Sequence, residues 1–310
     1  MKVNVAIVQA RSEYLRLQAS VDKAIHYIEK AAAQGADLIT FGETWLTGYP
    51  TWLDHCPGAC LWNHKPTKEV YSFLRKNSPT IPGKEIDALA RTAKKHGVIV
   101  VMGLNERVDM GPGNGTLYNS LITIGTNGDI LNHHRKLTPT YTERLVWGPG
   151  DGDGLKAVDT GYGRVGGLIC WEHWMPLTRQ ALHNEAEQIH ISVWPTVNEM
   201  HQIASRHYAF EGRSYVMATG LIESVADLPP QFELQAGLYE HPDQLLQRGG
   251  SAIIGPDGQY IAGPVYDEEM ILTAEIDLEK IDAEQLTLDV TGHYSRDDIF
   301  SFDVKKKRRN

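Results

Sequence analysis

Apolar runs and amphipathic segments alternate along the first third of the chain. Residues 3–9 (VNVAIVQ) and 36–43 (ADLITFGE) are apolar runs of strand length. Between them, apolar residues return every three or four positions along one face of a helix that ends at Gly35. The same spacing recurs over 83–96, immediately before the apolar run 97–103. The pattern predicts a strand, a helix and a strand, followed by a further helix and strand.

From Tyr118 the pattern changes to paired strands separated by tight turns. Apolar runs enclose Thr-Asn-Gly-Asp at 126–129 and Pro-Asp-Gly at 256–258, and both are hairpin signals. The other predicted elements are strands 163–170, 188–194, 214–223 and 270–276, a helix that begins at Pro176 and a helix over 199–213. Helices that alternate with strands and hairpins predict an α/β fold in which helices cover a mixed sheet. One domain over 1–310 is favoured over a weak internal duplication.

Three polar side chains stand at the ends of predicted strands. Glu43 closes the run 36–43, Lys136 closes ILNHHRK, and Cys170 closes the strand before the helix at Pro176. Residues of one active site commonly gather at strand ends in α/β folds, and a helix N-terminus near a cysteine favours thiolate over thiol. Each residue alone has an ordinary explanation, as a buried cysteine or a solvated charge. Together they offer a base, a cation and a nucleophile.

The composition of the 310 residues narrows the range of partners. Hydrophobic content of 42% and charged content of 22% are ordinary globular values. A net charge of -9 argues against nucleic acid, because such binding rests on neutralising phosphates, and favours a small-molecule partner. No apolar run approaches the ~20 residues that span a membrane, so no membrane partner is expected.

Cysteine usage and the chain ends predict a cytoplasmic, soluble protein. Cys56, Cys60 and Cys170 form an odd set without a disulfide framework, and the segment MKVNVAIVQ lacks a signal-peptide layout. The basic segment 304–310 is expected to be a short solvated tail rather than a tag for an anionic surface.

One cluster offers the residue types that bind zinc, namely His55, Cys56, Cys60 and His64. A Cys-x3-Cys spacing that encloses a proline and a glycine is not a zinc-finger spacing, so no metal is expected there. The sequence leaves the roles of Cys56 and Cys60 open.

Three long blocks carry a family resemblance. FGETWLTGYP around Glu43, HRKLTPTYTERLVWGPGDG around Lys136 and CWEHWMPL at Cys170 resemble the signature blocks of the nitrilase superfamily of carbon–nitrogen hydrolases. Cys-Trp-Glu-His, together with Tyr-x-Glu-Arg-x-x-Trp-Gly, is similar to the true nitrilase branch. The likeness extends from the first strand to GHYSRDD at 292–298. It implies a four-layer αββα sandwich and a homodimer that is often extended into spiral oligomers.

The resemblance also implies catalytic roles. Glu43 would be the general base, Lys136 the cation, Cys170 the nucleophile and Glu143 a second carboxylate that supports the lysine. Attack on a nitrile carbon places negative charge on nitrogen, which a fixed ammonium stabilises. A carboxylate takes the thiol proton and later a proton from water. Proton transfer and covalent catalysis suffice for this reaction, so neither a metal nor an organic cofactor is expected.

By the same analogy, an aromatic wall would hold the acyl group of the substrate. The residues implied are Tyr49, Trp52, Thr142, Trp147, Trp171 and Trp194. Such a wall suits an uncharged aliphatic or arylalkyl nitrile. Thr142 stands where many relatives carry histidine, which leaves the substrate range open.

Three alternatives compete with a nitrilase. An amidase or carbamoylase of the same fold would use the same residues, and a cyanide dihydratase is a second relative. A silent filament-forming or ligand-binding protein would leave the set of Glu43, Lys136 and Cys170 unexplained. Release of ammonia from nitriles, and the relative rates on nitriles and amides, separate these readings.

Overall fold

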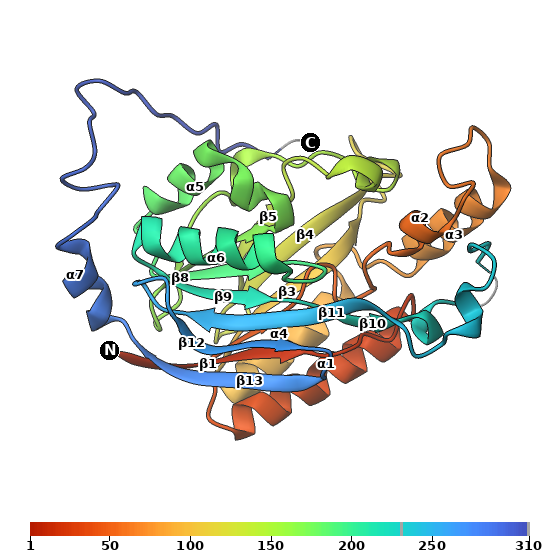
Figure 1. Cartoon of the computed structure of the whole chain (residues 1–310), viewed down its shortest axis with the longest axis horizontal. Helices are drawn as coiled ribbons and strands as arrows, with labels where there is room; N and C mark the ends of the chain where they lie inside the picture. Colours follow the sequence, from red (N-terminus) through yellow and green to blue (C-terminus); the bar gives the residue numbers. More distant parts are fainter. Residues whose placement is uncertain (230–231, 309–310) are drawn as a thin grey trace.

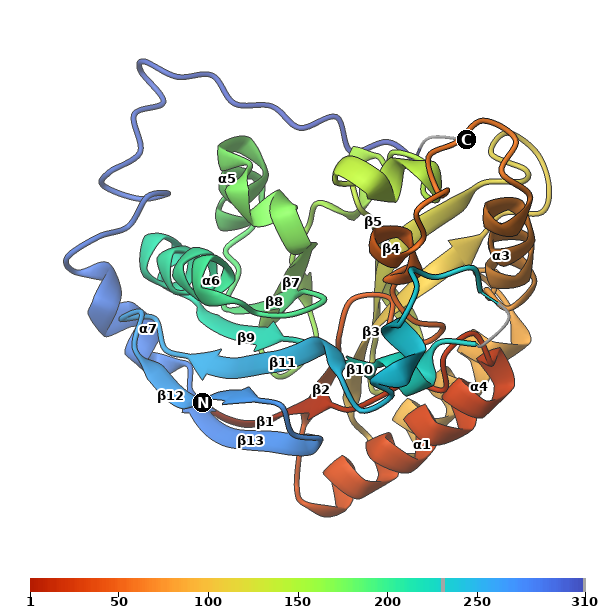
Figure 2. The same cartoon turned by 45° about the vertical axis from the view of Figure 1, so that its right-hand side comes forward.

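The fold is a stack of two β-sheets enclosed between two layers of helices. A computed structural model describes residues 1–229 and 232–308. Helices α1 (Leu17–Ala33) and α4 (Lys84–His96) lie outside the first sheet, and α5 (Pro176–His183) and α6 (Glu199–Gly212) lie outside the second (Figures 1 and 2). This arrangement confirms the predicted four-layer αββα sandwich.

The first sheet contains the N-terminal strands. Its six strands, in spatial order, are β13 (Met270–Asp277), β1 (Lys2–Gln9), β2 (Leu38–Phe41), β3 (Ile99–Arg107), β4 (Leu117–Ile124) and β5 (Ile130–Arg135). Strands β1, β2 and β3 are parallel, whereas β13, β4 and β5 are antiparallel to their neighbours. The predicted Asn-Gly turn joins β4 to β5.

The second sheet contains the strand that leads to Cys170. Its spatial order is β10 (Ile222–Ser224), β11 (Leu245–Ile254), β9 (Tyr215–Thr219), β8 (Ile189–Val193), β7 (Arg164–Ile169) and β6 (Val158–Asp159), with β12 (Tyr260–Tyr266) also paired to β11. The single strand predicted over 214–223 is wrong, because the chain breaks at Gly220 into β9 and β10. A Cβ atom on Gly220 would lie 2.1 Å from the carbonyl oxygen of Gly249, so this close crossing of two backbones requires glycine.

Alternate side chains of β1 enter two different cores. Val3, Val5 and Ile7 pack in the core that contains residues of both sheets. Ala6 and Val8 pack on the other face, with the buried sides of α1 and α4. A strand that is buried on both faces reads as a continuous apolar run, which explains the apolar stretch 5–8.

Several short helices have no clear signal in the sequence. They are α2 (Trp52–His55), α3 (Lys65–Lys76), α7 (Glu279–Gln285), η1 (Tyr141–Leu145), η2 (Gly152–Gly154), η3 (Cys170–Trp174), η4 (Val225–Asp227) and η5 (Leu238–Glu240). Helix α3 buries only Val70 and Leu74 fully, so its apolar stripe is too narrow to stand out. Within the described ranges, no helix is long and apolar enough to cross a membrane.

The described part of the basic C-terminal segment lies on the surface, with Lys305, Lys306 and Lys307 exposed. After α7 the chain follows an extended path back toward β5 (Figures 1 and 2). Lys306 pairs with Glu185, and Arg308 pairs with Asp153 at 2.9 Å and donates to the carbonyl oxygen of His133 at 2.6 Å. The last two residues of the predicted segment 304–310 lie outside the described residues.

Candidate active site

The three chemically notable strand ends meet at one place. Glu43 follows β2, Lys136 follows β5 in the same sheet, and Cys170 follows β7 in the other sheet. Because the two sheets are stacked, the ends of these strands converge. Cys170 has a positive φ of 55°, so the chain turns sharply from β7 into η3 at this residue. The structure thus brings together the residues that the strand pattern singled out.

The ammonium group of Lys136 lies between two buried carboxylates. Its Nζ atom is 3.0 Å from Oε1 of Glu43 and 2.7 Å from Oε2 of Glu143. Glu43 Oε1 also accepts a hydrogen bond from Nδ2 of Asn119 at 2.7 Å. The second oxygen of Glu43 has no hydrogen-bond partner within the described structure. This oxygen is available to accept a proton.

Glu143 is fixed in place by groups other than the lysine. Its carboxylate accepts hydrogen bonds from the hydroxyl of Tyr49 at 2.7 Å and from the backbone N–H of Thr140 at 2.6 Å. The ring of Trp147 lies 5.7 Å from the Lys136 ammonium, within the range of a cation–π contact. The lysine therefore has a defined position and a compensated charge.

Burial determines how the groups of this cluster hold their protons. It raises the pKa of Glu43 to about 7, the charge on Lys136 opposes this shift, and Glu143 adds to it. Burial also raises the pKa of the Cys170 thiol well above its usual value, while Lys136 and the backbone N–H of Trp171 oppose this. Burial would lower the pKa of Lys136, but the neighbouring thiol and carboxylates raise it, so the ammonium stays charged. The resting site holds a thiol beside a carboxylate that titrates near neutrality.

The atom types of the cluster also permit a metal ion. Ligand atoms of Glu43, Glu143 and Cys170 lie within 4.8 Å of one another. The ammonium of Lys136 already occupies the position between the two carboxylates, and its positive charge disfavours a further cation there.

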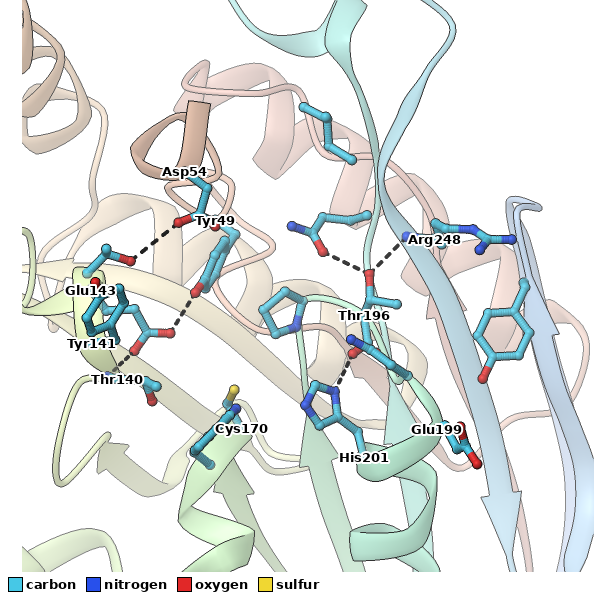
Figure 3. A pocket seen from close by; sticks show the side chains of 17 residues that line it. Tyr49, Asp54, Thr140, Tyr141, Glu143, Cys170, Thr196, Glu199, His201 and Arg248 are labelled. Atoms are coloured by element: carbon cyan, nitrogen blue, oxygen red, sulfur yellow. Dashed lines mark hydrogen bonds between the residues drawn. The ribbon is translucent and has the colours of Figure 1, made fainter. Parts of the chain in front are cut away.

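A cavity of about 650 Å³ opens above Cys170 (Figure 3). Figure 3 shows the sulfur atom facing this space, with Tyr49 and Glu143 on one side and His201 on the other. The predicted residues Tyr49, Thr142 and Trp171 line it. The charged or polar residues Asp54, Glu199, His201, Gln247 and Arg248 also line it. The wall is therefore more polar than the predicted aromatic wall.

The remaining predicted wall residues are not placed in this lining. Trp52 is buried against Phe232, and Trp147 lies beside Lys136 with its Nε1 bonded to Asn105. Trp194 is fully buried and stacks between two histidine rings. Large aromatic side chains are often core residues, and sequence position alone does not show which way they point.

Glu172 is a site residue that sequence reasoning missed. Its Oε1 accepts the backbone N–H of Leu137 and its Oε2 accepts the backbone N–H of Ile169, each at 2.7 Å. Nε2 of His134 lies 2.9 Å from Oε2. Glu172 thus links the segment after β5 to the end of β7. The only local signal in the sequence was an acidic residue two positions after the cysteine.

A thiol, a carboxylate and a fixed ammonium in one cavity are the groups that a hydrolase with a covalent cysteine intermediate requires. Residues 4–284 match the carbon–nitrogen hydrolase family, and the chain belongs to this family, as its signature blocks predicted. It is 39% identical to Nitrilase 2 from an unknown prokaryotic organism, over 99% of this chain and 94% of that protein. It is 36% identical to the aliphatic nitrilase of Rhodococcus rhodochrous, over 98% of this chain and 79% of that protein.

Solved structures show the same fold. The carbon–nitrogen hydrolase of Helicobacter pylori G27 has a TM-score of 0.71 at 19% identity, over 96% of this chain and 97% of that chain. A branch 10 member of the nitrilase superfamily from Saccharomyces cerevisiae has a TM-score of 0.69 at 21% identity, over 94% and 96%. At these identities the likeness concerns the fold alone.

Proposed function

We propose that this enzyme is a nitrilase, which converts an organic nitrile and two water molecules into a carboxylic acid and ammonia. The observation that carries the proposal is the Lys136 ammonium, held between Glu43 and Glu143 beside the Cys170 thiol. The two relatives that match nearly the whole chain are nitrilases, which favours nitriles over amides as substrates.

The first half of the reaction forms a thioimidate. Glu43 takes the proton of the Cys170 thiol, and the sulfur forms a bond to the nitrile carbon. One π bond of the nitrile breaks, and its electrons develop charge on nitrogen, which the Lys136 ammonium stabilises. Glu43 returns the proton to that nitrogen. Its unpartnered buried oxygen and a pKa of about 7 suit a group that both takes and returns a proton.

The second half releases ammonia and then the acid. Glu43 takes a proton from water as the water oxygen attacks the thioimidate carbon, and it passes this proton to the nitrogen. The new hydroxyl group gives its proton to the nitrogen as the carbonyl forms, and the carbon–nitrogen bond breaks to release ammonia. The remaining thioester is attacked by a second water molecule in the same way. The carbon–sulfur bond then breaks and Glu43 returns the proton to the sulfur, which releases the carboxylic acid and restores the thiol. Glu143 takes no proton in this scheme and keeps Lys136 charged and in position.

The pocket supports a small-molecule nitrile whose far end meets polar groups. Trp171 offers an apolar surface close to the sulfur, whereas Glu199 and Arg248 lie in the same lining. An uncharged aliphatic or arylalkyl nitrile remains the proposed substrate class, with room for a hydrogen-bonding substituent.

We also propose that residues 1–310 form one domain that pairs as a homodimer through α5 and α6. Leu177, Ile203 and Phe210 are large apolar residues that these helices leave exposed, by 71%, 47% and 48%. A shared apolar face of this kind is typical of an interface between copies. Light scattering after size-exclusion chromatography tests it, because Phe210→Glu should then yield monomers.

A panel of nitriles and their matching amides, with detection of ammonia, tests the function. A nitrilase releases ammonia from nitriles faster than from the amides. Faster release from amides would instead identify an amidase, and no release from either would support a silent binding protein. Cys170→Ala is the matched negative control.

A further inference from the structure

A line of buried polar groups runs from the backbone of Cys170 into the interior. The carbonyl oxygen of Cys170 lies 2.7 Å from Nδ1 of His173, and Nε2 of His173 lies 2.9 Å from Nε2 of His190. Nδ1 of His190 lies 2.8 Å from Oε1 of Glu187, and the hydroxyl of Tyr208 donates to Oε2 of Glu187 at 2.5 Å. All five residues are buried. The scheme above uses none of the last four.

The directions of the first two hydrogen bonds in this line follow from the carbonyl oxygen at its start. A carbonyl oxygen only accepts, so Nδ1 of His173 must carry a proton and donate it. His173 is then neutral, with Nε2 as an acceptor, because burial and the nearby His190 lower its pKa well below the usual value. His190 must therefore donate from Nε2 to His173. This arrangement leaves one proton to be shared between Nδ1 of His190 and the carboxyl group of Glu187.

The shared proton belongs to Glu187. Burial raises the pKa of Glu187 to about 8, and burial lowers the pKa of His190 well below its usual value. Protonated Oε1 then donates to His190, while Oε2 accepts from Tyr208. The ring of His183 packs against Tyr208, and Arg179 donates to the carbonyl oxygen of His173.

Gly166 of β7 leaves the space that Glu187 fills. A Cβ atom on Gly166 would lie 2.1 Å from Oε1 of Glu187. The glycine at position 166 therefore admits a buried carboxyl group beside the strand that leads to Cys170.

This line of hydrogen bonds acts on the peptide group that joins Cys170 to Trp171. Its oxygen accepts from His173, and its N–H, which belongs to Trp171, acts to lower the pKa of the Cys170 thiol and so favours the thiolate. A hydrogen bond to a carbonyl oxygen polarises the amide and strengthens its N–H as a donor. The line of groups thus ends on the peptide whose N–H favours the Cys170 thiolate.

We propose that Glu187 and Tyr208 are positioning residues that fix the tautomers of His190 and His173, and so hold the Cys170–Trp171 peptide with its N–H toward the thiolate. Loss of the Glu187 donor would allow His190 to move its proton to Nδ1. The Nε2 atoms of His173 and His190 would then both lack a proton and repel each other. His173 would move its proton from Nδ1 to Nε2 and so lose its hydrogen bond to the Cys170 carbonyl oxygen. This inference rests on Cys170 as the nucleophile of the proposed function.

The test compares Glu187→Gln with Glu187→Met in the full chain. The glutamine amide can donate to His190 and accept from Tyr208, whereas methionine fills the space without either bond. The readout is the pH dependence of iodoacetamide alkylation at Cys170, followed by mass spectrometry of its peptide. We expect Glu187→Met to lower the alkylation rate at pH 7 by about fivefold or more, the ratio expected for one weakened hydrogen bond. Glu187→Gln should stay within about twofold of wild type.

Glu223→Met is the matched control, because Glu223 is another carboxyl group whose pKa burial raises to about 8, and it belongs to β10. It should leave the alkylation profile unchanged. A folded Glu187→Met protein with a wild-type profile would overturn the proposal, and so would a Glu187→Gln profile that matches methionine. If Glu187→Met does not fold, ¹⁵N spectra of the wild type decide, since a proton on Nε2 of His173 would equally overturn it. Alkylation needs no nitrile turnover, so this result is independent of the proposed substrate.

Discussion

The carboxylate of Glu172 accepts a hydrogen bond from the backbone N–H of Leu137 at 2.7 Å. Leu137 directly follows Lys136, and the other oxygen of Glu172 accepts from Ile169, which directly precedes Cys170. One side chain therefore sets the separation between the ammonium and the thiol. Burial alone would raise the pKa of Glu172, but His134 and the two backbone donors hold it below the usual value, so the Glu172 carboxylate stays ionised.

Glu172→Gln should weaken the link that Glu172 makes between Leu137 and Ile169. One face of the amide would present N–H groups to a backbone N–H, so one of the two backbone bonds is lost. We expect kcat to fall by roughly 10–100-fold because a small misplacement of reacting groups is costly. KM should change by less than about threefold. Steady-state kinetics measure both, and a raised KM with an unchanged kcat would show that Glu172 serves binding instead. Glu185→Gln, at the site of a partly exposed ion pair with Lys306, is the control.

Cys170→Ala should abolish turnover without unfolding the protein, because it removes the sulfur and adds no bulk. Activity above roughly a hundredth of wild type would contradict the assignment of the nucleophile. Cys60→Ala, at an exposed thiol, should be neutral, and Cys56→Ala should cost only stability because Cys56 is buried among apolar residues. Ammonia release and thermal unfolding measure the two effects.

Lys136→Met should lower kcat by roughly 10²–10³-fold, because the ammonium acts where charge develops. The substitution also leaves Glu43 and Glu143 facing each other in a buried site without a cation, so the melting temperature should fall. The double variant Lys136→Met with Glu143→Gln separates these effects. It should recover the melting temperature and remain inactive. Recovery of turnover in the double variant would mean that the lysine only balances charge.

The pH profile of kcat/KM should report Glu43. A base must be ionised, and burial raises the pKa of Glu43 to about 7, so activity should fall as the pH falls through 7. The charge of Glu143 contributes to this shift, so Glu143→Gln should move the midpoint to lower pH even if its maximum rate is reduced. A wild-type midpoint near the ordinary glutamate value would show that Glu43 is not the group that titrates.

The grouping of Glu43, Lys136 and Cys170 was predictable because its signals are local. Glu43, Lys136 and Cys170 each close an apolar run, and the end of a strand is visible in the sequence itself. The stacking of the two sheets then brings these ends together. The split of the predicted strand 214–223 was not visible, since it depends on the approach of Gly249 from a distant strand.

The pocket wall and the supporting hydrogen bonds were not predictable in the same way. Whether a tryptophan lines a cavity or fills a core depends on its neighbours in space, and Trp194 proved to be fully buried. Tyr208, which donates to Glu187, and Leu137, which donates to Glu172, come from other segments of the chain. A sequence shows that such acids are present, but not that a donor stands opposite each of them.

Thr142 offers the sharpest test of substrate size. It lines the cavity, and its Oγ1 donates a long hydrogen bond of 3.5 Å to Oδ1 of Asp54. Among the described residues only this weak contact holds the Thr142 side chain, so a larger side chain at this position can extend into the cavity. We expect Thr142→His to fill this space and to shift the preference toward smaller nitriles. One pocket contact usually changes selectivity by about 1–3 kcal/mol. The measurement is the ratio of kcat/KM for a bulky nitrile to that for a short one.

Thr142→Val is the matched control, because it keeps the shape of threonine and removes the hydroxyl. If size decides, valine leaves the ratio unchanged and histidine lowers it. If the contact with Asp54 decides, valine already changes the ratio, since a freed Asp54 carboxylate alters the polar side of the pocket. A ratio that stays constant or rises in the histidine variant would show that position 142 does not limit the pocket, and the limit would then have to be sought at Trp171, on the side of the sulfur.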